Sequence, residues 1–264
     1  MEEEIIQKTA DRKRKLFVFA AIISAFLIYY AVMSAFGPAR KLNEMKNELL
    51  SVEDEKMKEK IYSDSVYLSL LKEKSFLQSR TLMAQTDSIY LVINLSDSTS
   101  AIEISGVTVH SAKISSFDAS RILMKSDGSV ISNMLAMPLT TASYVASIRK
   151  EPLMIKIAPK DTSEYKPDII PDTSVVEPVN FILEMSDGTK IYVYQEENES
   201  PSDVWSNFVF DLKDRLRNTW GSLKSIALFK IPEYHPYIKI RIPGNDAKII
   251  FRAMPVNGQL GVYI

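Results

Sequence analysis

Residues 89–114 read IYLVINLSDSTSAIEISGVTVHSAKI, and this pattern decides the fold class of the region around them. A β-branched run at 89–95 is followed by the turn residues Ser-Asp-Ser-Thr and by a second apolar run at 101–104. A third run, 107–114, begins after Gly106. Short runs of this composition separated by turn residues are typical of consecutive strands. The stretch therefore predicts three strands joined by tight turns.

Further strand patterns lie downstream, and Ser186-Asp187-Gly188 predicts a tight hairpin between two of them. Residues 159–178 contain four prolines with repeated Asp, Thr and Ser, which predicts an inserted loop. Residues 115–150 show no clear period and give no prediction. The downstream strands are expected at 153–158, 181–185, 190–194, 237–242 and 260–264.

Two helices are expected among these strands. Ser200-Pro201-Ser202-Asp203 is typical of a helix start, because Ser caps the first turn and Pro suits it. A shorter helix is expected at 246–253. Residues 88–264 are therefore predicted to form a mainly β, β-rich α+β domain. Apolar side chains recur along the first helix in a stripe that we expect to face the core, with a partner-docking surface as the alternative: Trp205, Phe208, Leu212, Leu216, Trp220 and Leu223.

Residues 37–87, upstream of the strands, have the composition of a helical stalk. The stretch 39–86 is rich in Lys, Glu, Leu and Met and contains no Gly or Pro. Leu42, Met45, Leu49 and Val52 follow the 3–4–3 spacing of a coiled-coil seam, but the spacing is lost after Val52. A stalk that oligomerises, a solvated single helix and a helix packed on its own domain all remain open.

Residues 16–36 read LFVFAAIISAFLIYYAVMSAF and carry no charge. As a helix these 21 residues span about 31 Å, close to the roughly 30 Å of a bilayer core, and the following Gly37-Pro38 is expected to end the helix. A cleaved signal peptide is the competing interpretation. Its apolar region is shorter, at about 7–15 residues, and Tyr29-Tyr30 interrupts any cleavage site. We therefore expect a single membrane span.

The charged residues on either side of the span predict its orientation. Five Lys or Arg residues lie between Lys8 and Lys15, whereas only Arg40 and Lys41 follow the span closely. Positive flanks remain in the cytoplasm, so residues 1–15 are expected inside and the domain outside. The net charge of −1 does not favour nucleic-acid binding, whereas contact of the basic cluster with anionic lipid is compatible with its position.

Composition excludes several kinds of site. The chain contains no cysteine, so disulfides, zinc ribbons, iron–sulfur clusters and a thiol nucleophile are excluded. The two histidines, His110 and His235, lie far apart in the sequence, which makes a His-rich metal site unexpected. We expect no metal and no cofactor.

The last 28 residues, YIKIRIPGNDAKIIFRAMPVNGQLGVYI, carry a family resemblance. They resemble the end of the L,D-transpeptidase catalytic domain, a bacterial peptidoglycan cross-linking family. Residues 90–104 are similar to the first hairpin of that family, so the resemblance brackets 89–264 and implies the same fold. The matching parts are Ile240-Arg241-Ile242-Pro243 for the Ile-Arg-x-Pro motif, Gly244-Asn245-Asp246-Ala247 for the helix start, and Met254-Pro255-Val256-Asn257-Gly258 with 260–264 for the close.

The resemblance fails at the catalytic positions. It places Tyr237 at the motif's His, Ile238 at its Gly, Lys239 at its nucleophilic Cys and Arg241 at its Arg. The family reaction needs a thiolate, which this chain cannot supply, and an acyl-lysine amide would be a dead end. The alternation of cationic and aromatic residues with Ile238, Ile240 and Ile242 instead predicts a half-buried strand with a solvated cationic face.

The loop before this strand suggests a binding rim. It is rich in aromatic residues and proline, which suits an extended ligand, and His235 lacks a nucleophile to activate. Asn245 and Asp246 are expected to cap the short helix. The expected rim comprises Tyr234, His235, Tyr237 and Arg241.

Together these features predict a single-pass protein of the bacterial inner membrane with a periplasmic domain. We expect a catalytically inactive L,D-transpeptidase-like pseudoenzyme that binds peptidoglycan or a periplasmic partner. The alternative is a structural subunit of an envelope-spanning assembly, such as a secretion machine, in which the stalk forms homo-oligomers and the domain docks partners. An active enzyme with an unfamiliar nucleophile is disfavoured, because no Ser lies beside a His in a strand-to-helix elbow.

Overall fold

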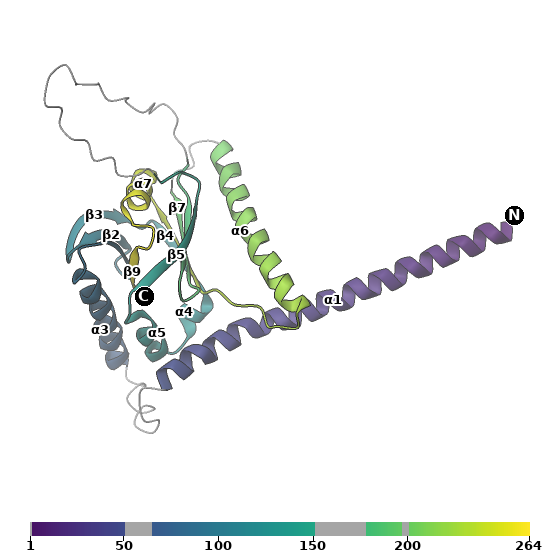
Figure 1. Ribbon diagram of the computed structural model, residues 1–264, viewed down its shortest axis with the longest axis horizontal. Coiled ribbons are helices and arrows are strands. Elements are labelled where there is room, and N and C mark those ends of the chain that lie inside the picture. The colour runs from purple at the N-terminus through teal and green to yellow at the C-terminus, as the bar shows by residue number, and fades with distance from the viewer. Residues whose placement is uncertain (1, 51–64, 151–177, 197–200) are drawn as a thin grey trace, which may run out of the picture. The chain divides into compact units, whose positions relative to one another are not determined.

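The computed structural model describes residues 2–50, 65–150, 178–196 and 201–264 (Figure 1). Contacts divide the chain into two compact units. We call Met1–Glu48 with Lys213–Tyr234 the anchor unit, and Leu49–Leu212 with His235–Ile264 the sheet unit. Helix α6, Pro201–Ala227, contributes its first part to the sheet unit and its last part to the anchor unit.

The anchor unit is built on α1, Glu2–Leu50. Within the described part of the chain, α1 is the one helix that is long and apolar enough to cross a membrane. Its most apolar 18-residue window has a mean hydropathy of 2.4. Length and composition of this kind suit a membrane anchor and a signal sequence alike. The expected helix end at Gly37-Pro38 is wrong, because α1 continues through Pro38. The strong helix formers that follow Pro38 offset the cost of about 3 kcal/mol for an interior proline.

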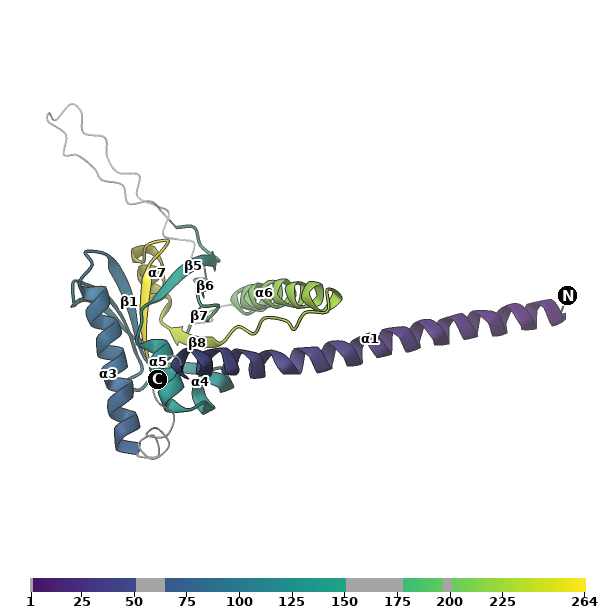
Figure 2. The ribbon, with the colours of Figure 1, turned by 60° about the horizontal axis from the view of Figure 1, so that its bottom comes forward.

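Gly37 has a packing role in the anchor unit. The segment after α6 passes so close to α1 that a Cβ on Gly37 would lie 3.2 Å from the Pro232 carbonyl oxygen and 3.5 Å from Cβ of Tyr234. Further along α1, the Tyr29 and Phe229 rings pack with centroids 6.1 Å apart. The end of α6 lies close to α1 in both views (Figures 1 and 2). Gly37 was expected to end the helix, but it instead lets the segment after α6 pack against α1.

The described strands of the sheet unit form one mixed sheet in the order β3-β2-β1-β9-β5-β6-β7-β8-β4. The β1/β9 and β7/β8 pairs are parallel and the other pairs are antiparallel. The bounds are β1 Ile89–Asn94, β2 Thr99–Ile104, β3 Val107–Lys113, β4 Ser116–Ala119, β5 Leu139–Ala146, β6 Phe181–Met185, β7 Lys190–Gln195, β8 Tyr237–Ile242 and β9 Gln259–Tyr263.

Four further helices are described in the sheet unit. Helix α3 packs closely on β9, since a Cβ on Gly261 would lie 2.7 Å from Met83 Cε, and Phe76 contacts the Tyr263 ring. Of the alternatives for the stalk, packing on the domain therefore describes α3. The coiled-coil seam extends to Val52, which lies outside the described residues. The helices are α3 Ser65–Ala84, α4 Arg121–Lys125, α5 Gly128–Leu135 and α7 Gly244–Ala253.

One face of the β6-β7-β8 region is apolar. Phe251 of α7 packs on Phe181 at 5.1 Å and on Tyr144 at 5.6 Å between ring centroids. Strand register places Phe181, Val193 and Ile240 on the same face, and all three are buried. The alternate residues of these strands point to the other face, which is polar and carries the residues of interest below.

The expected strands at 89–95, 101–104, 107–114, 181–185, 190–194, 237–242 and 260–264 are confirmed within a residue or two, as is the hairpin at Gly188, whose φ is +85°. The coarse α+β layout is likewise confirmed. The strand at 153–158, and all of the Pro-rich insertion 159–178 except Pro178, lie outside the described residues. The stretch without a prediction contains β4, α4, α5 and β5.

The core prediction for the α6 stripe is wrong. Trp205, Leu216 and Trp220 are 67%, 60% and 73% exposed. The covered side of α6 is polar: Asn180 donates a hydrogen bond to Asn207, and the Tyr194 hydroxyl donates one to Asp211. Because the sheet face that α6 meets is polar, the polar side of the helix faces it.

Candidate functional site

The register of three neighbouring strands gathers the motif positions on the polar face. Lys239 of β8 lies opposite Tyr192 of β7 and Asp118 of β4. Arg241 lies opposite Tyr194 and Ser116 in the same way. Directly opposed residues of paired strands share a face, so these side chains form one continuous surface.

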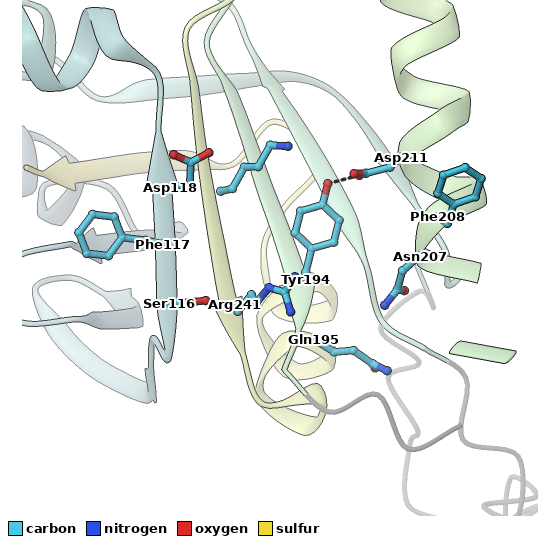
Figure 3. Close-up of a pocket in the computed structure, with 10 residues that line it drawn as sticks. Ser116, Phe117, Asp118, Tyr194, Gln195, Asn207, Phe208, Asp211 and Arg241 are labelled. Atoms are coloured by element: carbon cyan, nitrogen blue, oxygen red, sulfur yellow. Dashed lines mark hydrogen bonds between the residues drawn. The ribbon is translucent and has the colours of Figure 1, made fainter. Parts of the chain in front are cut away.

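A hollow of about 310 Å³ opens on this surface, and we call it the β8 hollow. Figure 3 shows Arg241 between Ser116 and Tyr194, with Asp211 and Asn207 reaching in from α6. The first part of α6 therefore forms one wall and β4 the opposite one. The lining residues are Ser116, Phe117, Asp118, Tyr194, Gln195, Asn207, Phe208, Asp211, Lys239 and Arg241.

Lys239, at the nucleophile position of the resemblance, lies among aromatic rings. Its Nζ is 5.1 Å from the centroid of the Tyr192 ring and 5.4 Å from that of Tyr237, which are cation–π distances. Lys239 is half-buried and Arg241 is exposed, and neither makes an ion pair with a residue that the structure describes. The predicted cationic face of β8 is confirmed.

Carboxylates stand on both walls of the hollow. Asp118 on β4 is 3.4 Å from the Tyr237 hydroxyl, which donates to it, and Asp211 accepts from Tyr194. The hollow thus presents two cations on its floor and one anion on each wall. This distribution matches a ligand that carries both carboxylate and ammonium groups.

The expected rim is only partly assembled at the hollow. Arg241 lines it, and Tyr237 lies beside Lys239. His235 instead donates from Nδ1 to the Gly188 carbonyl at 3.0 Å, which ties the approach loop to the β6/β7 hairpin. Tyr234 belongs to the anchor unit and lines a different hollow there. His235 is therefore an anchor for its loop, and the binding surface lies further along β8.

The prediction that Asn245 and Asp246 cap α7 is wrong. The N-cap residue is Pro243, and no side chain caps the helix. Asp246 lies in the first turn, where a carboxylate suits the helix dipole, and its Oδ1 is 3.0 Å from His110 Nε2 on β3. This contact joins two elements that are far apart in the sequence.

Sequence reasoning missed most of the lining residues. Tyr194 could have been predicted, since it alternates with buried Val193 in the pattern of a strand with one polar face. Asp118 lies on the four-residue strand β4, too short for a visible period. Asn207 and Asp211 lie off the apolar stripe of α6, and no prediction was made for them because that stripe was expected to face the core.

Comparison of the chain with protein-family models, with curated proteins and with solved structures found no match. Within the ranges that the structure describes, no group of three or more His, Asp or Glu side chains is placed to hold a metal ion. The proposal for what the β8 hollow binds therefore rests on the charges and hydrogen bonds of its lining residues.

Proposed function

We propose that this chain is a membrane-anchored, catalytically inactive L,D-transpeptidase-like envelope protein that binds peptidoglycan stem peptides in the β8 hollow. One observation carries the proposal: the hollow opens at Lys239 and Arg241, the two positions at which the resemblance places the nucleophile and the motif's Arg. A hollow at these two positions supports a retained binding cleft, in a chain that lacks the thiol of the family.

The chemistry of the hollow supports a peptide ligand with charges of both signs. Stem peptides carry free carboxylates, which suit Lys239 and Arg241, and free amino groups, which suit Asp118 and Asp211. The volume of about 310 Å³ is at the lower end for ligand pockets, so it holds part of an extended chain rather than a whole muropeptide.

Binding without turnover follows from the residue at the nucleophile position. Attack by Lys239 on a peptide carbonyl would release an amine and leave a lysine amide, which water does not readily cleave. The family instead relies on a thioester that a second amine can open. With no cysteine in the chain, the exchange has no chemical route in this hollow.

The proposed location follows from α1. The basic cluster before the apolar run supports an N-terminus in the cytoplasm of a bacterial cell and a sheet unit in the periplasm. Peptidoglycan lies in the same compartment, so the anchor holds the β8 hollow within reach of the proposed ligand.

The test is binding of the detergent-solubilised full chain to purified sacculi. We expect saturable binding, at least tenfold weaker in the variant Lys239→Ala/Arg241→Ala, because about 1.4 kcal/mol lost from the two cations gives that factor. Lys248→Ala removes an exposed cation on α7, outside the hollow, and should bind like the native chain.

Equal binding by all three proteins would contradict the assignment of the hollow, and absence of saturable binding would contradict the peptidoglycan ligand. Mass measurement of the same preparation addresses the alternative function. A defined oligomer with co-purifying proteins would favour a structural subunit of an envelope assembly.

A further inference from the structure

The last part of α6 and the turn after it carry exposed apolar side chains inside the anchor unit. We call Leu216, Trp220, Leu228 and Phe229 the α6 patch. These side chains are 60%, 73%, 60% and 82% exposed, respectively. Large apolar side chains gathered on one short exposed segment are costly in water and mark an interaction surface.

The patch is fixed to α1 at a defined point. Phe229 packs on Tyr29, and Gly37 admits the backbone of Pro232. Tyr29 lies within the apolar run and precedes its end at Phe36 by seven residues, which is about 10 Å along a helix. If α1 crosses a bilayer, Phe229 therefore lies about 10 Å inside the outer edge of the hydrocarbon core, among the acyl chains of the outer leaflet.

The backbone at Phe229 points to a role for its ring. The α6 end is closed by hydrogen bonds from the Phe229 and Lys230 amides to the carbonyls of Ile226 and Ser225, at 3.0 and 2.9 Å. Phe229 has φ +56°, a left-handed position that usually holds Gly because a Cβ there costs about 1–2 kcal/mol. A bulky, exposed aromatic residue in such a position is explained by what its ring contacts.

Exposed cations accompany the patch, while the nearest acid on the helix, Asp214, is buried. Tryptophan and phenylalanine with interspersed Lys and Arg have the composition of a helix that lies in a membrane interface and prefers anionic lipid. The exposed cations are Lys213, Arg215, Arg217, Lys224 and Lys230.

We infer that the α6 patch docks on the outer leaflet of the membrane that α1 crosses, with the Phe229 ring inserted below the headgroups, among the acyl chains. The inference rests on the membrane anchor of the proposed function but not on the peptidoglycan ligand. Its occupant is a lipid surface, because the patch continues directly from the exposed apolar surface of α1 at Tyr29.

The test uses fluorescence of the full chain in liposomes containing phosphatidylglycerol. The chain has two tryptophans, Trp205 and Trp220, so Trp205→Phe/Trp220→Phe provides a dark background. In that background, Phe229→Trp reports on the patch and Phe26→Trp reports on the middle of the apolar run. We expect lipids brominated high on the acyl chains to quench the first reporter most strongly, and lipids brominated deep in the chains to quench the second most strongly.

Two substitutions perturb docking in the Trp205→Phe chain, where Trp220 is the reporter. Leu216→Glu places a charge in the patch and should shift Trp220 emission to the red and abolish its quenching by brominated lipid. Gly221→Glu places the same charge at an exposed position where a Cβ meets nothing within 4 Å, and should leave the quenching unchanged. Phe229→Gly removes the inserted ring, so it should weaken quenching of Trp220. Because the same substitution relieves the left-handed strain, thermal stability should not fall.

The outcomes are distinguishable from failure of the anchor. If Phe26→Trp is quenched but Phe229→Trp and Trp220 are not, the docking inference is overturned while the anchor stands. If Phe26→Trp is itself unquenched, the membrane anchor fails and the inference fails with it. Docking of a second copy in place of lipid would give unquenched Trp220 together with a dimer that Leu216→Glu dissociates, and this result too would overturn the inference.

Discussion

Arg80 of α3 grips Glu103 of β2 through two hydrogen bonds, with Nε 2.8 Å from Oε2 and Nη2 2.6 Å from Oε1. The Glu103 side chain is only 3% exposed, and Thr108 donates a third hydrogen bond to it at 3.1 Å. These bonds to Glu103 are the main cause that raises the pKa of Arg80. The pair fastens α3 to β2, the strand next to edge strand β3, at the opposite end of the sheet from the strands that line the β8 hollow.

Removing Arg80 should therefore be costly. Arg80→Ala leaves a buried carboxylate without its cation, and we expect a loss of about 3 kcal/mol in the free energy of unfolding. Urea unfolding of the detergent-solubilised chain measures this loss. Arg40→Ala breaks an exposed pair with Glu44 on α1 and should cost less than about 0.5 kcal/mol. Equal effects of the two substitutions would show that burial of Glu103 is unimportant.

Alkaline stability should depend on Tyr90. Burial is the main cause that raises its pKa above the ordinary 10.0, so the folded chain favours the neutral phenol. Its contribution is complete below pH 10 and is lost as the pH rises through the raised pKa. Tyr90→Phe should flatten the unfolding free energy above pH 10 and lower it by about 1 kcal/mol at neutral pH, since the Gly106 amide loses its acceptor. An unchanged alkaline slope would assign the loss to other groups.

Packing of α3 on β9 predicts a steric effect at Gly261. A Cβ there would lie 2.7 Å from Met83 Cε, so Gly261→Val should overpack the contact and cost about 1–3 kcal/mol. Gly221→Ala on α6 is the matched control, because its Cβ meets nothing within 4 Å and Ala favours a helix by about 1 kcal/mol. Thermal unfolding should move in opposite directions for the two variants.

Gly37 should control attachment of the segment after α6. Gly37→Leu places a side chain where the Pro232 carbonyl lies, so the segment should detach from α1 and trypsin should cleave after Lys230 faster. Phe36→Leu alters the neighbouring residue, whose side chain is 55% exposed, and should leave the cleavage rate unchanged. Similar rates for all three proteins would mean that Gly37 does not hold the segment.

Orientation is accessible through cysteine labelling, because the chain has no cysteine of its own. In intact spheroplasts, a maleimide that cannot cross membranes should label Lys248→Cys and should not label Glu3→Cys. Both variants should be labelled after detergent is added. Labelling of Glu3→Cys in intact cells would reverse the proposed topology.

The strands were predictable where one or both faces meet the core. Ile89, Val92 and Ile240 belong to apolar or alternating runs that read directly as β structure, and the structure confirms them. Strand β4 was not predictable, because Ser116, Phe117 and Asp118 are exposed at the sheet edge and burial imposes no pattern on them. Since one wall of the hollow stands on β4, the sequence could not reveal the hollow as a whole.

Two of the wrong predictions, the core-facing α6 stripe and the helix end at Gly37-Pro38, have a common physical origin. The α6 stripe and Gly37 were both read from local rules, helical amphipathicity in one case and helix breaking in the other. In each case a tertiary contact decides: Tyr194 and Asn180 hold the polar side of α6, and Pro232 approaches α1 at Gly37. Rules based on local sequence take no account of the segment that a helix packs against. They therefore predicted the wrong buried side for α6 and the wrong role for Gly37.

The parallel pairing of β1 with β9 sets the order in which the domain can be completed during synthesis. Tyr90 pairs with Gln259, and β9 also joins β5, so this late strand closes the gap between the two parts of the sheet. Until residues 259–263 leave the ribosome, β1 and β5 each present an unpaired edge that can bind other chains. A nascent chain therefore carries two aggregation-prone strand edges until β9 has been synthesised.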